Sequence, residues 1–209
     1  EEGGNRVAVA CDARLSSPSL TQALIRGLTA SGCNVLDAGQ GPTPMLYFAM
    51  QTQPVQAGVM VTGSHNPPDY NGFKIVVGER VLDGQELQAL RQRMLEGPLR
   101  QGKGSVEQVR LHDSYIDAVM QEVQLTRPLK VVVDAGNGAA GELAVMTFEA
   151  LGCEVVQLFC EPDGHFPNHH PDPSEPDNLS ALMLEVQAQE AAMPPGTESG
   201  FRANAKRSS

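Results

Sequence analysis

A strand–helix–strand pattern that occurs twice constrains the fold of this chain more than any other feature. An apolar run at residues 6–11 is followed by apolar residues at helical spacing, and Gly32-Cys33-Asn34-Val35 leads into a second run. The pattern begins again at residues 130–133 and closes through Gly152-Cys153-Glu154-Val155, 120 residues after the first. Such units pair their strands in parallel through a right-handed crossover. We therefore predict an α/β fold of two similar three-layer α/β/α domains with mixed, mainly parallel sheets. A duplication explains the repeat, although any two strand–helix–strand units look alike and chance similarity stays open.

Changes in composition divide the chain into segments. A Gly-containing linker at residues 100–105 separates two predicted helices, so the first domain is expected at residues 1–108 and the second at residues 109–190. Beyond Glu190 the apolar periodicity ends, and proline, small and basic residues take over. Residues 191–209 are therefore expected to be a disordered tail.

Charge and apolar content exclude several kinds of partner. The net charge is −10, from 15 Lys and Arg against 25 Asp and Glu, and no basic cluster stands out, so we expect no nucleic-acid partner. The apolar runs are far shorter than the roughly 18 residues of a membrane span, and the N-terminus is acidic, so we expect no membrane partner and a cytoplasmic protein. The oligomeric state is left open, with a monomer slightly preferred.

The four cysteines lie in or beside predicted strands without a Cys-x-x-Cys pair. Buried free thiols are the favoured interpretation, and a disulfide framework or a zinc site is the alternative.

Residues 57–77 contain the strongest functional signal. Two apolar runs flank a polar loop that carries Ser64, His65, Asn66 and two prolines, which indicates strand, exposed loop and strand with Ser64 at the tip. His65 could donate or accept a proton, Asn66 could hydrogen-bond a ligand, and Lys74 on the returning strand could neutralise a phosphate. The same residues also suit an ordinary hairpin loop. A serine hydrolase is disfavoured, because the chain lacks the Gly-x-Ser-x-Gly elbow here.

The segment from Thr62 to Lys74 resembles the active-site serine loop of the α-D-phosphohexomutases, in particular the bacterial phosphomannomutase/phosphoglucomutase type. The resemblance extends to residues 41–44, 133–138 and 166–173, and it covers about residues 6–190. It implies an isomerase that moves phosphate between the 1- and 6-oxygens of a hexose through phosphoserine and a bisphosphorylated sugar. Hexose phosphates are the implied substrates, Mg²⁺ the implied metal, and a glucose 1,6-bisphosphate-type sugar the implied activator.

The resemblance also implies roles for individual residues. Ser64 matches the serine that carries the phosphoryl group and offers a phosphate oxygen to Mg²⁺. His65 and Lys74 match residues with acid–base and phosphate-binding roles, and Asn66 matches a site hydrogen-bonding residue.

The chain departs from the family pattern in ways that weaken the expected activity. The second domain is incomplete, the remaining Mg²⁺ ligands have no counterpart, and Cys11 and Ala13 stand where relatives usually have Arg and Gly. We therefore predict a truncated phosphohexomutase with weak or no activity, and the alternative is a non-catalytic α/β binding or scaffold module that keeps the fold.

Two further motifs favour a structural interpretation. The cluster of His165, His169 and His170 could suggest zinc, but three prolines stiffen this loop and a structural role is preferred. Residues 134–138 follow a strand and precede a helix without a phosphate-binding glycine motif, which predicts a tight turn.

Overall fold

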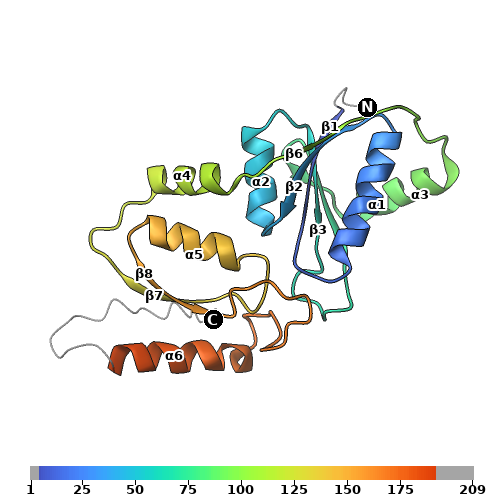
Figure 1. The fold of residues 1–209 in the computed structure, drawn as a ribbon. Helices are drawn as coiled ribbons and strands as arrows, with labels where there is room; N and C mark the ends of the chain where they lie inside the picture. The colour runs from blue at the N-terminus through green and yellow to red at the C-terminus, as the bar shows by residue number, and fades with distance from the viewer. Residues whose placement is uncertain (1–4, 192–209) are drawn as a thin grey trace. The chain divides into compact units, whose positions relative to one another are not determined.

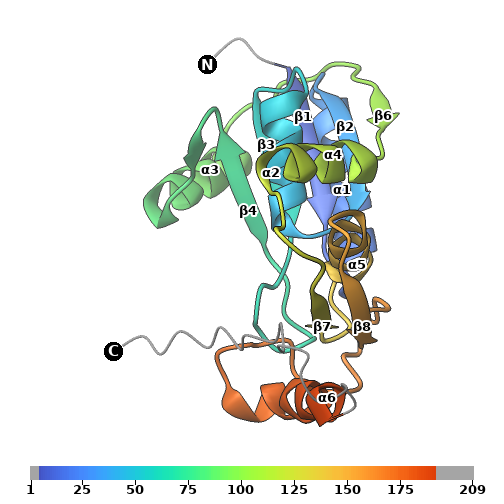
Figure 2. The ribbon, with the colours of Figure 1, turned by 90° about the vertical axis from the view of Figure 1, so that its left-hand side faces the viewer.

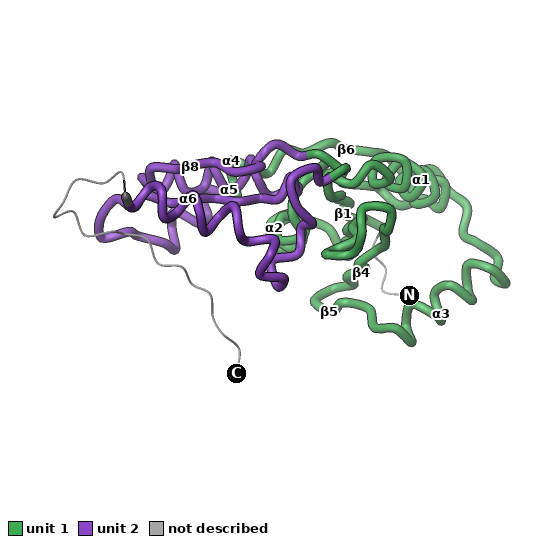
Figure 3. Tube along the Cα trace, turned by 90° about the horizontal axis from the view of Figure 1, so that it is seen from below, with its two compact units in different colours: residues 1–115, 163–165 green, residues 116–162, 166–209 purple. Residues whose placement is uncertain are grey.

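A computed structural model describes residues 5–191 and divides the chain into two compact units (Figure 3). The first unit contains the chain up to Tyr115 together with Asp163–His165, and the second contains Ile116–Pro162 and the chain from Phe166 on. The tail expected at residues 191–209 lies, from residue 192 on, outside the described residues.

The first unit is built on a six-stranded mixed sheet with the strand order β5-β4-β3-β1-β2-β6. β1 pairs in parallel with β2 and β3, and β2 pairs in parallel with β6. The pairs β3–β4 and β4–β5 are antiparallel. The mixed, mainly parallel sheet confirms the predicted α/β class. The strands are β1 Arg6–Cys11, β2 Asn34–Gln40, β3 Ala57–Val61, β4 Phe73–Val77, β5 Arg80–Val81 and β6 Val106–Gln108.

Helices cover both faces of this sheet because its central strands are apolar on both sides. Figures 1 and 2 show α1 (Ser17–Ala30) and α2 (Thr43–Thr52) on opposite faces. On the α1 face, Val7 and Val9 of β1 pack with Leu24 and Leu28 of the helix. The alternate residues of β1 are also buried, which gives the near-continuous apolar run typical of a strand covered on both faces.

The sequence predicts helix N-caps at Ser17, before Pro18, and at Asp83, and the first of these is corrected. The N-cap of α1 is Ser16 rather than Ser17, because the Ser17 hydroxyl is buried and donates to Asp12. Helical spacing places Leu87, Leu90, Met94 and Leu95 on one face of α3 (Gly84–Glu96), and Met94 and Leu95 on that face are 60% and 67% exposed. The predicted cap of α3 at Asp83 is confirmed, as the first residue of a capping box with Glu86.

The second unit contains the parallel pair β7 (Lys130–Asp134) and β8 (Glu154–Leu158), with α5 (Gly141–Ala150) connecting them. α5 packs on both strands, and α6 (Ser180–Ala191) packs on β7. α6 follows a 3₁₀ turn at Pro176–Leu179. α4 (His112–Glu122) precedes these elements along the chain.

The repeated Gly-Cys-x-Val sequence has a local physical cause. Gly32 and Gly152 have φ of 87° and 82°, the left-handed conformation that favours glycine. The following amides of Cys33 and Cys153 donate five residues back, to the carbonyls of Leu28 and Phe148. This is the Schellman arrangement that ends a helix, so the motif stops α1 and α5 and directs the chain into the next strand.

All four cysteines are free, with Cys11 and Cys153 buried, which confirms the expectation of free thiols. Within residues 5–191, none of the helices is long and apolar enough to cross a membrane.

Candidate functional site

The candidate site lies where β1 and β3 end. These strands are parallel neighbours with Cys11 opposite Val61, so the segments that follow them leave the sheet at the same edge. The connection from β3 to β4, residues 62–72, extends beyond the end of the sheet (Figure 2) and is called the serine loop below. Ligand sites of open α/β sheets form at this carboxyl edge.

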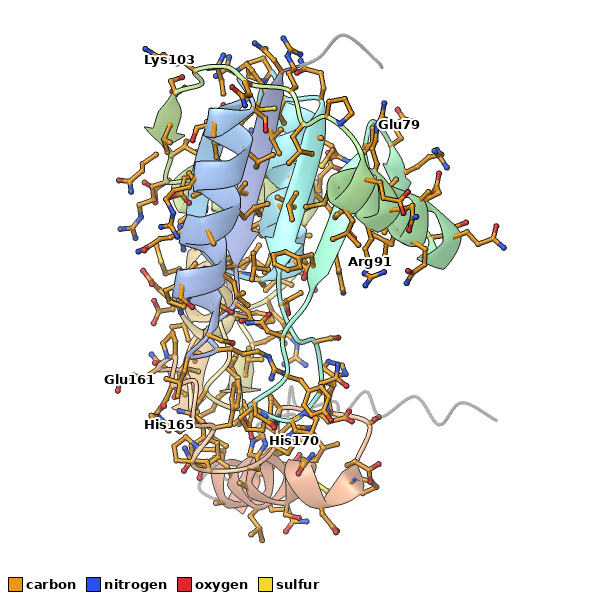
Figure 4. All side chains as sticks on the ribbon, turned by 90° about the vertical axis from the view of Figure 1, so that its right-hand side faces the viewer. Glu79, Arg91, Lys103, Glu161, His165 and His170 are labelled. Atoms are coloured by element: carbon orange, nitrogen blue, oxygen red, sulfur yellow. The ribbon has the colours of Figure 1, made fainter. Side chains whose placement is uncertain are left out.

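Arg14 is the buried centre of the serine loop. The charged residues Arg91 and Lys103 project outward from the first unit (Figure 4), whereas Arg14 is 1% exposed. Its Nη1 donates to the carbonyl oxygens of Pro67 (2.5 Å) and Tyr70 (3.0 Å). Its Nη2 donates to those of Ser64 (2.8 Å) and Asn66 (2.7 Å). One guanidinium therefore donates hydrogen bonds to four backbone carbonyls of the serine loop.

Asp12 holds Arg14 and the start of the serine loop together. Its Oδ2 accepts from Arg14 Nε and from the Gly63 amide, each at 3.2 Å. Its Oδ1 accepts from the Arg14 amide at 3.0 Å and from Ser17 Oγ at 2.5 Å. The four interactions match the roughly four acceptor positions of a carboxylate, which accounts for an acidic residue immediately after a buried strand.

Asn71 fixes the other end of the serine loop. Its Nδ2 donates to Ser16 Oγ at 2.9 Å and Ser17 Oγ at 2.8 Å, and its Oδ1 accepts from the Gly72 amide at 2.8 Å. Both ends of the serine loop are thus tied to the residues that connect β1 to α1.

Gly63 is required by close approach rather than by a special backbone angle. A Cβ on Gly63 would lie 2.5 Å from Arg14 Nε, 2.6 Å from Arg14 Cζ and 2.6 Å from the Tyr70 carbonyl oxygen. The Arg14 guanidinium packs against the Gly63 backbone, so a side chain at position 63 would collide with it.

The predicted site residues are all exposed. Ser64, His65 and Asn66 share the serine loop and are exposed, and Lys74 lies on β4, opposite Met60 of β3, with an exposed side chain. Ser64 has φ of 54°, a conformation that non-glycine residues rarely adopt and that clusters at functional sites. Its amide donates to Thr62 Oγ1 at 3.0 Å.

The sequence alone did not single out Asp12, Arg14 or Asn71. Asp12 and Arg14 directly follow the first apolar run, and Asn71 lies in the segment from Thr62 to Lys74 that carries the resemblance. An Asp-x-Arg sequence at the carboxyl end of a central parallel strand was the available signal, because a charge there must find partners once it is buried.

His165, His169 and His170 form no metal site, because within residues 5–191 no three His, Cys, Asp or Glu side chains are placed to hold a metal ion. His169 Nε2 contacts the Asp134 carboxylate at 3.0 and 3.1 Å, and its Nδ1 contacts the His170 carbonyl oxygen at 3.0 Å. His169 therefore fastens the proline-rich loop to the turn after β7.

The two contacts of His169 shift its pKa. Burial lowers the pKa of His169, but the hydrogen bonds to the His170 carbonyl and the Asp134 carboxylate outweigh it and raise the pKa above its ordinary value. Both ring nitrogens face acceptors, an arrangement satisfied when both carry a proton.

The turn after β7 is also held from within, as predicted for residues 134–138. Gly136 and Asn137 both have positive φ, and the Asn137 side chain donates to the Glu161 carbonyl and accepts from Asn168. These bonds satisfy the buried amide of Asn137 and leave it a structural role.

Both halves of the chain match models of one protein family. Residues 1–98 match the family model described as phosphoglucomutase/phosphomannomutase alpha/beta/alpha domain I, and residues 113–195 match that of domain II. A phosphomannomutase/phosphoglucomutase of Pseudomonas aeruginosa is 52% identical over 185 residues, which are 88% of this chain and 40% of the relative. A phosphoglucomutase of Neisseria gonorrhoeae is 47% identical over 91% of this chain and 42% of the relative.

A crystal structure of a phosphoglucomutase/phosphomannomutase family protein from Burkholderia thailandensis superimposes with a TM-score of 0.88 at 47% identity. The match covers 90% of this chain and 43% of that structure. The chain thus spans about 40% of the length of the curated relatives it matches, at their first two domains. Fold, sequence and family models agree, and the chain belongs to the phosphoglucomutase/phosphomannomutase family, whose members are isomerases.

Proposed function

We propose that this chain carries a phosphoryl group on Ser64 and exchanges it with hexose phosphates, as an intramolecular phosphotransferase of the phosphomannomutase/phosphoglucomutase type. The observation that supports the proposal most is the construction of the serine loop. Ser64 is exposed at positive φ on a loop whose carbonyls bind a buried arginine. Because a buried cation binds the backbone of this loop, the exposed hydroxyl is held in one direction. Phosphoryl transfer requires such fixed positioning of the nucleophile.

The proposed step is an exchange of one phosphorus–oxygen bond for another. The Ser64 Oγ attacks the phosphorus of a sugar bisphosphate, the Oγ–P bond forms, and the P–O bond to the sugar breaks. The hydroxyl proton passes to a general base, for which we propose His65, and the sugar oxygen takes up a proton. Lys74 would neutralise charge on the phosphate, and Asn66 would hydrogen-bond to the ligand.

Mg²⁺ is expected from the family, but the described residues do not fit it. Mg²⁺ prefers an octahedron of hard oxygen ligands, and within residues 5–191 no acidic group of the required size converges near the serine loop. Ser64 could offer a phosphate oxygen only when phosphorylated, so no step is assigned to the metal. We propose that loading of Ser64 occurs and that turnover by this chain is weak or absent.

The test is phosphorylation of the purified chain by glucose 1,6-bisphosphate, followed by intact mass and peptide mapping. We expect one phosphoryl group on Ser64, its loss in Ser64→Ala, and no change in Ser105→Ala, a matched exposed serine before β6. A wild-type chain that stays unmodified would overturn the proposal and support the alternative, a non-catalytic α/β binding or scaffold module. Sustained conversion of glucose 1-phosphate would contradict the predicted weak turnover.

A further inference from the structure

We propose that Arg14 is a positioning residue for phosphoryl transfer, which fixes the direction in which Ser64 presents its hydroxyl without touching the substrate. The inference rests on the proposed function of Ser64. It adds a specific requirement, namely that the planar guanidinium at position 14 is needed for the reaction and a positive charge alone does not suffice.

The hydrogen bonds of Arg14 suit a guanidinium in both number and direction. A guanidinium has five N–H donors in a rigid plane, and the donors of Arg14 reach the Asp12 carboxylate and four backbone carbonyls of the serine loop. An ammonium has three donors around one nitrogen. A lysine at position 14 could therefore satisfy only part of the set, although its charge would be the same.

Ser64 is hydrogen-bonded on both sides of its Cα. Its carbonyl accepts from Arg14 Nη2 at 2.8 Å, and its amide donates to Thr62 Oγ1 at 3.0 Å. With both peptide planes held, the direction of the Cα–Cβ bond is set. The positive φ of Ser64 costs free energy and persists only where surrounding contacts impose it.

The position of Ser64 also depends on the central strand of the sheet. Asp12 binds Arg14 Nε through the same oxygen that accepts from the Gly63 amide, and Asp12 follows β1 directly. The central strand of the sheet thus positions Arg14, and Arg14 positions the serine loop. Loss of Arg14 is expected to misdirect Ser64 while leaving the exposed side chains of His65 and Lys74 chemically unchanged.

The experiment compares wild type with Arg14→Lys and Arg14→Ala, with Arg80→Ala as the control. Arg80 forms an exposed ion pair with Glu86 at 2.9 Å. Arg80→Ala therefore shows the effect of losing an arginine that does not bind the serine loop. Hydrogen exchange of the Asn66 and Tyr70 amides, which donate to the Gly63 and Pro67 carbonyls, reports on the loop independently of activity. Single-turnover phosphorylation of Ser64 at several glucose 1,6-bisphosphate concentrations reports on chemistry.

We expect loop amide exchange to rise about tenfold or more in both Arg14 variants, with the β1 amides unchanged. The maximal phosphorylation rate is expected to fall about a hundredfold, with the half-saturating concentration nearly constant. Millimolar guanidinium chloride is expected to restore part of the rate in Arg14→Ala and none in Arg14→Lys, where the lysine occupies the space. A merely structural role would give no such selective rescue.

The inference would be overturned if the folded Arg14→Lys variant showed unchanged hydrogen exchange of the serine-loop amides. It would also be overturned if these amides exchanged faster while the maximal rate of Ser64 phosphorylation stayed unchanged. In both cases the proposed phosphorylation of Ser64 would still hold. Absence of wild-type phosphorylation would instead overturn the proposed function on which it rests. If Arg14→Ala does not fold, Arg14→Lys decides, because it keeps a cation in the buried site.

Discussion

Replacing Gly63 with alanine is expected to destabilise the first unit by pushing Arg14 out of place. The new Cβ would lie 2.5 Å from Arg14 Nε and 2.6 Å from the Tyr70 carbonyl oxygen, both under the 3.0 Å that real Cβ contacts respect. The Tyr70 carbonyl is backbone and itself bound to Arg14 Nη1, so neither neighbour can move alone. The substitution should therefore break several bonds of the Arg14 network at once.

The magnitude follows from the number and exposure of these bonds. A hydrogen bond to a charged group contributes about 1.5–3 kcal/mol net, and the carbonyls of this exposed loop would recover part of that from water. We expect Gly63→Ala to lower the free energy of unfolding by about 2–4 kcal/mol. The matched control is Gly27→Ala in α1, where nothing lies within 4 Å of the new Cβ. That change should stabilise by about 0.5–1 kcal/mol, because glycine is costly inside a helix.

Urea unfolding followed by tyrosine fluorescence measures this difference in the first unit. The chain has no tryptophan, and its three tyrosines, Tyr47, Tyr70 and Tyr115, all belong to that unit. A loss below about 1 kcal/mol for Gly63→Ala would refute the reasoning, because it would mean that Arg14 moves aside freely. A double-mutant cycle with Arg14→Ala adds a second check, since the two effects must be strongly non-additive if alanine acts through Arg14.

Two further predictions concern other parts of the chain. The folded pKa of His169 is raised above 6.5, so its stabilisation is full below that pH and is lost as the pH rises through the folded pKa. Denaturation followed by circular dichroism from pH 5 to pH 9 should show a gap between wild type and His169→Asn that narrows with rising pH, and a pH-independent gap would contradict this. Asp83→Ala should destabilise α3 by about 1 kcal/mol, because Asp83 accepts from the Glu86 amide at 2.9 Å. Hydrogen exchange of the first turn of α3 measures the effect, and unchanged protection there would count against a stabilising cap.

The local patterns that could be predicted from the sequence are those set by neighbours along the chain. The valine-rich runs, the glycines that end α1 and α5, and the Asp83 cap act within a few residues, and the structure confirms each. The exposure of Met94 and Leu95 could not be predicted in this way, because helical spacing shows that apolar residues share a face and not whether anything covers it.

The sequence by itself determined the α/β class, the family and the presence of an exposed serine between β3 and β4. Apolar periodicity and turn residues are local, and the serine loop is a continuous segment. Only the tertiary structure decided what holds that serine in place, because Asp12 and Arg14 lie about 50 residues away from the loop they organise. They meet Gly63 and Ser64 only because β1 and β3 are parallel neighbours that end at the same edge of the sheet. Because Arg14 is buried, its N–H donors need acceptors nearby. The nearby acceptors are the backbone carbonyls of the serine loop.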